Sequence, residues 1–211
     1  MVMAFVLSIL IVLALLLISE WWWRKNKKHD ELSRKFVHIT VGSFVAFWPY
    51  LLTPLQIKFI SVAFIVVVII SKYFNIFQAI HSVQRPTNGE LWFALALLIM
   101  AFWVKDPHIF TTSLLIMALA DGLAAIFGLK YGKNNSYKVF GMKNSYFGSA
   151  TFLLVSYIIL LTFWAMTTPP YPGIYMLPIA VSAMVLENFG YKGLDNLVVP
   201  LFVALNLTLL S

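Results

Sequence analysis

The segment SLLIMALADGLAAIFGLKYGK, residues 113–133, decides the fold class, because it is apolar for most of its length and yet contains a carboxylate, Asp121. A run of about 20 apolar residues is long enough to cross a bilayer as a helix. A charge inside such a run is costly and usually serves a function. The segment therefore predicts a membrane-spanning helix that carries a functional aspartate.

The composition of the whole chain agrees with this prediction. Of the 211 residues, 61% are hydrophobic and 11% are charged, and the mean hydropathy is +0.88, values that soluble globular domains do not reach. The first apolar run ends in WWWRKNKK rather than in a cleavage site, so we expect it to remain as a span. The chain has no cysteine, which excludes disulfides, thiol catalysis and cysteine-bound metals. We predict an all-α, polytopic membrane helix bundle.

Apolar runs separated by turn residues predict eight membrane spans, with seven as the alternative. The eight spans are 2–20, 36–53, 56–74, 90–104, 108–128, 147–166, 174–188 and 196–210. Thirteen of the 15 Lys and Arg residues fall in the loops on one side, and only Lys58 and Lys105 fall on the other. This bias predicts that the basic side is cytoplasmic and that both termini lie on the opposite side.

The acidic residues gather on the same predicted side. Seven of the eight lie in cytoplasmic loops or in the cytoplasmic halves of spans, and only Asp106 lies outside. A transporter more often places its polar groups near the midplane of the membrane. The distribution therefore favours an enzyme that works at the cytoplasmic membrane surface, with a small-solute transporter as an alternative.

The first polar cluster is HDELSRKFVHITVG, residues 29–42, in which Glu31, Arg34, Lys35 and His38 have the spacing i, i+3, i+4 and i+7. On a helix these side chains share one face. One interpretation is a basic cluster that binds lipid headgroups, with His38 as a packing residue. The other is an anion site for phosphates, with His38 deeper in the membrane.

The second cluster is HSVQRPTNGELWF, residues 81–93, which contains Arg85 and Glu90. A glutamate is favoured in the first turn of a helix by the helix dipole. This segment is either an ordinary helix start or a contributor to a polar site.

The third cluster continues the opening segment through residue 152. Asp121 is followed by Gly122 and Gly128, small residues that let a helix or a ligand approach closely. Gly148 and Ser149 stand where the next span begins, and a helix N-terminus is a natural phosphate site. Four lysines lie in the loop between Gly128 and Gly148, at Lys130, Lys133, Lys138 and Lys143. The alternative is an Asp121–lysine structural bridge beside a solvated basic loop.

The fourth cluster is ENFGYKGLDNLVVPL, residues 187–201, with Glu187, Asp195 and Asn196. Carboxylates near phosphate-binding lysines can hold magnesium, which bridges phosphate oxygens. Asp195 could instead only cap the last helix.

These segments together resemble the CTP-dependent lipid kinase family, which includes dolichol, phytol and farnesol kinases and the yeast-type diacylglycerol kinase, and which is distantly similar to CDP-diacylglycerol synthases. The resemblance runs from about residue 31 to 201, behind an N-terminal anchor at 1–30, in a single membrane domain over 1–211. It rests on four patterns: E-x-x-R-K-x-x-H from Glu31, D-G-x-A-x-x-x-G-x-x-Y-G-K from Asp121, the Gly148–Ser149 pair, and E-x-x-x-x-x-G-x-D-N-x-x-x-P from Glu187. The chain departs from the family at KNSYFGS, where Lys143 is one residue early and Asn144 takes the usual lysine position.

The resemblance implies that the γ-phosphate of CTP is transferred to the hydroxyl of a membrane lipid alcohol, with Mg²⁺ as cofactor. The lipid would be an isoprenoid alcohol or diacylglycerol, and phosphatidate cytidylyltransferase is the alternative enzyme. We expect no nucleic-acid partner and leave a homo-oligomer open. The expected catalytic residues are Asp121, His38 and Glu187, and the expected metal ligands are Asp121, Glu187 and Asp195. The expected phosphate-binding residues are Arg34, Lys35, Arg85, Lys133, Lys138, Lys143, Gly148 and Ser149, with Glu31, Glu90, Gly122, Gly128 and Asn196 elsewhere in the site.

Overall fold

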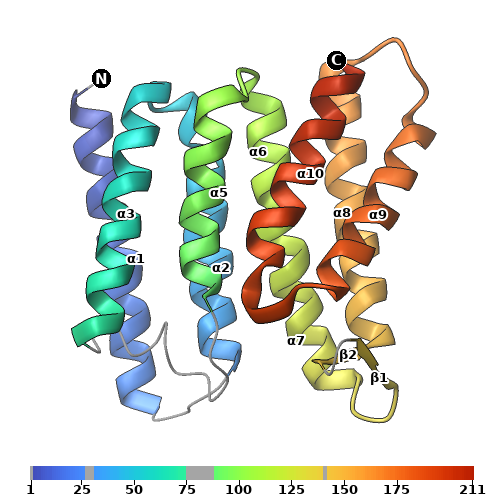
Figure 1. Cartoon of the computed structure of the whole chain (residues 1–211), viewed down its shortest axis with the longest axis horizontal. Coiled ribbons are helices and arrows are strands. Elements are labelled where there is room, and N and C mark those ends of the chain that lie inside the picture. Colours follow the sequence, from blue (N-terminus) through green and yellow to red (C-terminus); the bar gives the residue numbers. More distant parts are fainter. Residues whose placement is uncertain (1, 27–30, 75–87, 140–141) are drawn as a thin grey trace.

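The computed structural model describes residues 2–26, 31–74, 88–139 and 142–211. In this part of the chain, long helices stand side by side in a bundle (Figure 1). They are α1 (Val2–Asn26), α2 (Glu31–Ala46), α3 (Pro54–Phe74), α5 (Gly89–Trp103), α6 (Pro107–Leu115), α7 (Asp121–Tyr131), α8 (Tyr146–Thr167), α9 (Met176–Asn188) and α10 (Asp195–Leu210). The predicted all-α class is confirmed, apart from one hairpin.

The hairpin lies in the basic loop, where the sequence analysis predicted no strands. Strands β1 (Ser136–Val139) and β2 (Met142–Ser145) pair antiparallel, with Lys138 opposite Lys143. It packs at the N-terminal end of α8, on the side of the bundle away from both termini (Figure 1). Two strands of this length give no hydrophobic alternation that would separate them from a polar loop.

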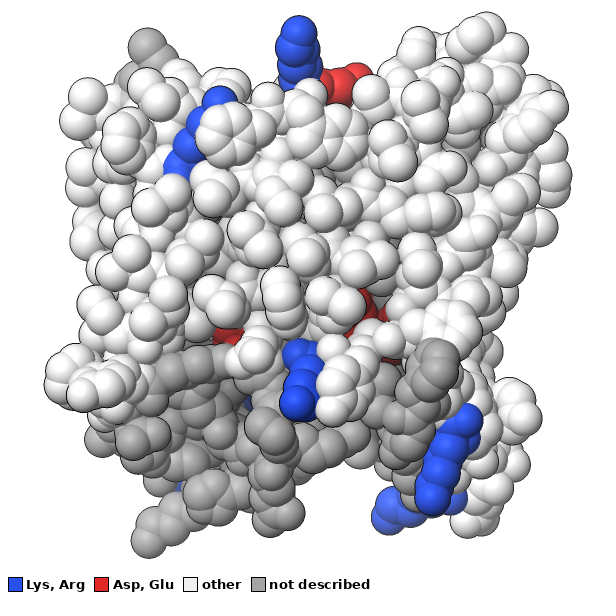
Figure 2. Space-filling view, in the orientation of Figure 1, with Lys and Arg blue, Asp and Glu red and all other residues white. Residues whose placement is uncertain are grey.

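Four helical segments are long and apolar enough to cross a membrane: Val2–Trp22, Pro54–Ser71, Pro107–Tyr131 and Tyr146–Thr167. The apolar helices Gly89–Trp103, Gly173–Asn188 and Asp195–Leu210 are shorter, so the count of eight spans stays a prediction. The second predicted span, 36–53, is too long, because α2 ends at Ala46 and a 3₁₀ turn follows at Trp48–Tyr50 with proline at its start. On the face that Figure 2 shows, a broad band without charged residues lies between charged groups nearer the two rims, as expected for a membrane protein.

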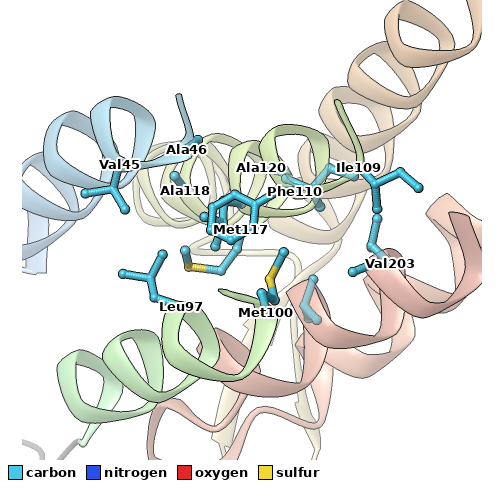
Figure 3. Packing of buried hydrophobic residues seen from close by; sticks show 14 of the residues in the cluster. Val45, Ala46, Leu97, Met100, Ile109, Phe110, Met117, Ala118, Ala120 and Val203 are labelled. Atoms are coloured by element: carbon cyan, nitrogen blue, oxygen red, sulfur yellow. The ribbon is translucent and has the colours of Figure 1, made fainter. Parts of the chain in front are cut away.

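The segment quoted at the outset forms the centre of the bundle. α6 and α7 run on from one another through a π-helical turn at Ile116–Ala120. Within this rod 72% of the apolar stretch is buried inside the bundle. The corresponding share is 17% in α1 and 22% in both α3 and α8. Figure 3 shows its buried residues Phe110 and Met117 packed with Leu97 and Met100 of α5 and Val203 of α10. Asp121 therefore lies on the most deeply buried of these four helical segments.

Candidate active site

An ion pair between α2 and α7 is the centre of the candidate site. Lys35 Nζ lies 2.5 Å from Asp121 Oδ1 and 2.6 Å from Oδ2, and their side chains are only 7% and 9% exposed. The sequence left open that Asp121 is bridged by a lysine, and the structure confirms a bridge. Its lysine comes from the first polar cluster, 86 positions away, and not from the neighbouring basic loop.

His38 lies one turn from Lys35 on the same face of α2 and contacts the same carboxylate. Its Nε2 is 3.1 Å from the carbonyl oxygen of Met117 and 3.3 Å from Asp121 Oδ2. Both neighbours are hydrogen-bond acceptors, so Nε2 carries the proton, and Nδ1 of the neutral ring is then an acceptor. Among the described residues Nδ1 has no hydrogen-bond partner. The π-helical turn supplies the Met117 carbonyl directly before Asp121, and such turns are frequent at functional sites.

The glycines of the third cluster bring helices together. A Cβ on Gly122 would lie 2.2 Å from Cγ1 of Ile39 on α2, and a Cβ on Gly128 would lie 2.8 Å from Ser145 Oγ. Gly122 thus lets α2 approach α7 closely enough for Lys35 to reach Asp121. Of the two roles that the sequence left open for these glycines, the structure supports helix packing.

A polar cavity of about 550 Å³ opens beside the ion pair. It is bounded by α2, α7, the β1–β2 hairpin, the start of α8, the end of α9 and the start of α10. Its lining includes Arg34, Lys35, Asp121, Gly128, Lys133, Gly148, Ser149, Glu187, Asp195 and Asn196 from the predicted site. Three of the four predicted polar clusters, at 34–35, 121–149 and 187–196, therefore form one cavity, which is large enough to hold a small molecule.

Three carboxylates face this cavity. Asp121 acts electrostatically on both Glu187 and Asp195, so the charge of each of the three carboxyl groups depends on the other two. Asp195 is the first residue of α10 and does not occupy its cap position, which belongs to Leu194. In the described part of the chain, no three His, Asp or Glu side chains are grouped closely enough to hold a metal by themselves.

The cationic side chains divide into those that line the cavity and those that do not. Arg34, Lys35 and Lys133 line it, as predicted, and so does Lys192. Lys138 is exposed and lies outside the lining. Arg85 and the side chains of Lys143 and Glu31 lie outside the described residues. Asn144 stands at the cavity and donates a hydrogen bond to the Asn188 carbonyl oxygen at 3.2 Å.

The hairpin is attached to the bundle by a polar network that the sequence analysis did not predict. Tyr137 OH donates to Asn188 Oδ1 at 2.6 Å, and Ser149 Oγ donates to the same oxygen at 3.1 Å. Ser145 caps α8 by accepting a hydrogen bond from the Gly148 N–H at 3.0 Å. The Gly148 amide, predicted to bind phosphate, therefore has a protein partner in this structure, and the Ser149 hydroxyl belongs to the network that holds the hairpin.

Asn196 lies where the cavity adjoins a smaller one, and Glu90 lines the smaller one. Glu90 is in the first turn of α5, as predicted, and lines the smaller cavity together with His38 and Arg34. Asn196 Nδ2 donates to the Gly89 carbonyl oxygen at 3.0 Å, while its buried Oδ1 has no hydrogen-bond partner in the described part of the chain. Asn196 and Arg34 line both cavities.

Sequence reasoning missed four residues of the site: Asn144, Ser145, Asn188 and Lys192. Ser145 was detectable, because a serine three residues before Gly148 at the start of an apolar run is typical of a helix N-cap. Lys192 was counted only as a loop cation. Its backbone is left-handed, with φ 52°, and it is followed by Gly193 with φ 83°, a tight turn that the lysine–glycine pair could have indicated.

The arrangement suits the handling of a polyphosphate. Cations, carboxylates and small backbone groups line one cavity at one end of the bundle. Phosphoryl transfer depends mainly on positioning and on neutralising phosphate charge.

Two curated proteins are similar to this chain. A phytol kinase from Synechocystis sp. is 34% identical over 185 residues, which cover 83% of this chain and 77% of the relative. A probable chloroplastic phytol kinase from Triticum aestivum is 32% identical over 146 residues, covering 62% of this chain and 47% of the relative. No protein-family model matches the chain, and no solved structure matches it.

Proposed function

This chain belongs to the lipid kinase family that includes the phytol kinases, and from this premise we propose that it transfers the γ-phosphate of CTP to a lipid alcohol at the cytoplasmic face of the membrane. It is a phosphotransferase with an alcohol acceptor. The proposed acceptor is of the phytol, geranylgeraniol or polyprenol type, with diacylglycerol as the second choice. The buried Lys35–Asp121 pair at the wall of a basic and acidic cavity is the observation that carries the proposal.

Phosphate binding is assigned to the cations that line the cavity. Arg34, Lys133 and Lys192 surround the space that a triphosphate would occupy. Lys35 would turn from Asp121 toward the phosphates, since its flexible stem and three donors suit either partner. Because the Gly148 N–H already donates to Ser145 Oγ, the lysines carry more of this role than the predicted helix N-terminus.

The carboxylates fit a magnesium ion that arrives with the nucleotide. In kinases the ion is usually held by one or two carboxylates together with substrate phosphates and waters, so a complete protein cage is unnecessary. Glu187 and Asp195 would hold it, and Asp121 would join them once Lys35 has turned away. The ion would supply neutralisation of phosphate charge when bound.

The acceptor step uses His38. The lipid hydroxyl oxygen forms a bond to the γ-phosphorus while the bond from that phosphorus to the β-phosphate oxygen breaks, and the nucleoside diphosphate leaves with the electron pair. The hydroxyl proton passes to His38 Nδ1, which has no partner among the described residues. Asp121 beside Nε2 stabilises the resulting imidazolium.

The first experiment is a transfer assay with the full chain in lipid nanodiscs. Magnesium and γ-labelled CTP, UTP or ATP would be tested against phytol, geranylgeraniol, a polyprenol and diacylglycerol. Label should move from CTP into an isoprenoid alcohol and should be lost in Asp121→Asn. Asp106→Asn is the matched control, because Asp106 caps α6 at the opposite rim and asparagine caps equally well. Full activity in Asp121→Asn, or no transfer from any nucleotide, would refute the proposal.

His38→Ala should lower kcat by about 10²–10⁴-fold, the usual contribution of a general base, with little change in nucleotide KM. The matched control is His108→Ala, since the His108 ring bonds to Tyr50 at the opposite rim and lines neither cavity. A kcat for His38→Ala within twofold of the control would assign the proton to another acceptor.

A further inference from the structure

A second cavity lies beside the polar one, and most of its wall is apolar. It holds about 50 Å³ and is lined by Leu16 of α1, Val37, Val41 and Gly42 of α2, Phe64 of α3 and Phe93 of α5. Its polar lining consists of Arg34, His38, Glu90 and Asn196. We call this cavity the slot. It has an apolar body and one polar end.

The polar end of the slot adjoins the polar cavity, in which we propose that the nucleotide binds. Arg34 and Asn196 line both spaces, whereas His38 lines only the slot. His38 presents Nε2 to Asp121 and Met117, so its acceptor nitrogen Nδ1 is the ring atom left for a ligand. His38 of the slot and Asp121 of the polar cavity are thus in contact where the two spaces adjoin.

The apolar body of the slot lies next to helices that face lipid. Leu16 comes from α1 and Phe64 from α3. Only 17% of the apolar stretch of α1 and 22% of that of α3 are buried in the bundle. A row of aromatic rings connects α3 to His38, since Phe64 packs edge-to-face on Phe93 and Phe93 packs edge-to-face on His38, each with ring centroids 6.1 Å apart. A lipid chain between α1 and α3 would have a continuous apolar path to this histidine.

We propose that the slot is the acceptor site: one lipid chain lies between Leu16, Phe64 and Phe93, and its terminal hydroxyl donates a hydrogen bond to His38 Nδ1. This inference rests on the proposed lipid kinase function and adds to it the place of the acceptor and the residues that select it. Leu16, Phe64 and Phe93 come from three different helices, so the width of the slot is set by the packing of α1, α3 and α5.

The size of the slot selects for a single chain. Sites that enclose a whole small molecule usually hold about 300–1,000 Å³, whereas this slot holds about 50 Å³. It therefore takes only the part of one chain nearest the hydroxyl, and the remainder stays in the bilayer. Diacylglycerol carries two ester-linked chains beside its hydroxyl and does not fit. The slot thus favours a linear isoprenoid alcohol.

Bulk placed in the slot tests the proposal. Leu16→Trp adds an indole to a residue that is 5% exposed, and Leu17→Trp adds the same indole one position on, where the side chain is 59% exposed. Initial rates of the full chain in nanodiscs would give KM for alcohol and for nucleotide. We expect Leu16→Trp to raise the alcohol KM at least tenfold, with nucleotide KM unchanged, and Leu17→Trp to match the native protein.

A widened slot gives the opposite prediction. Phe64→Ala removes a ring from the wall, so the rate with diacylglycerol relative to phytol should rise at least fivefold. This variant also keeps the proposal testable if Leu16→Trp does not fold.

A binding measurement separates the slot from the kinase function. A phytol analogue with a diazirine near its hydroxyl would be photolysed with the protein without nucleotide, and the labelled peptides identified by mass spectrometry. Label on α1, α3 or α5 that is lost in Leu16→Trp and kept in Leu17→Trp supports the slot even if no phosphate is transferred. Transfer with label on other helices, and with equal kinetics in the two tryptophan variants, would overturn the slot and leave the kinase function standing.

Discussion

Removing one member of the Lys35–Asp121 pair should destabilise the bundle much more than removing both. At an effective dielectric constant of about 20, unit charges 2.5 Å apart attract by about 7 kcal/mol. The cost of taking both charges out of water offsets most of this attraction. Lys35→Met leaves the 9%-exposed Asp121 side chain with His38 as its remaining partner. An uncompensated buried charge costs about 3–5 kcal/mol, and we expect Lys35→Met to lose that much stability.

The double variant Lys35→Met/Asp121→Asn contains no buried charge at these two positions. Replacing a whole buried pair by neutral groups is often close to neutral, so we expect its stability to return to within about 1 kcal/mol of the native protein. Its phosphotransferase activity should stay lost, because both groups act on the nucleotide. Recovery of stability without recovery of activity would separate the two roles of the pair.

Unfolding in mixed detergent micelles, followed by the fluorescence of the seven tryptophans, measures these free energies. Lys105→Met is the control, since Lys105 is exposed at the opposite rim, and a surface change of this kind should stay within about 0.5 kcal/mol. If the double variant is no more stable than the less stable of Lys35→Met and Asp121→Asn, the two residues act independently. The reasoning from a buried pair then fails.

Three further predictions follow from the packing and the chemistry of the site. Gly122→Ala should cost about 1–3 kcal/mol by overpacking, because its Cβ would meet the Ile39 side chain at 2.2 Å, and adding Ile39→Ala should restore both stability and activity; no rescue would contradict the close helix contact. Tyr137→Phe should cost about 1 kcal/mol and raise nucleotide KM, because it removes the hydroxyl that holds the hairpin, whereas Tyr146→Phe, at a 66%-exposed side chain, should change neither. A chelator of divalent cations should abolish transfer, and readdition of magnesium should restore it; transfer that persists in the chelator would exclude the proposed ion.

Much of the site was predictable because its parts are local. The spacing of Arg34, Lys35 and His38 fixes one helix face whatever surrounds it, and the structure does direct Lys35 and His38 to one carboxylate. Asp121 was detectable because a charge within an apolar run is costly. The hairpin residues were not, since Tyr137 and Asn188 are polar residues in a loop and at a helix end, and only their contact gives them a role.

The sequence by itself determined the class of the molecule. Apolar runs separated by short polar loops predict helices that span a membrane. In lipid, the backbone N–H and C=O groups of such a run must form their hydrogen bonds within the run itself, as a helix allows. The four patterns also indicated a lipid kinase before any geometry was known, and the similarity to phytol kinases agrees.

The tertiary structure alone decided which groups meet. Nothing local selects Lys35, rather than one of the nearer loop lysines, as the partner of Asp121. That choice follows from the close approach of α2 to Gly122 and from the π-helical turn before Asp121. Apolar residues such as those at Ile116–Ala120 fit a π-helical turn as well as an α-helical one, so the hydropathy pattern does not reveal the π-helical turn. The division into a polar cavity and an apolar slot likewise arises only when the helices and the hairpin that line them pack together, because a cavity belongs to the packing and not to any single segment.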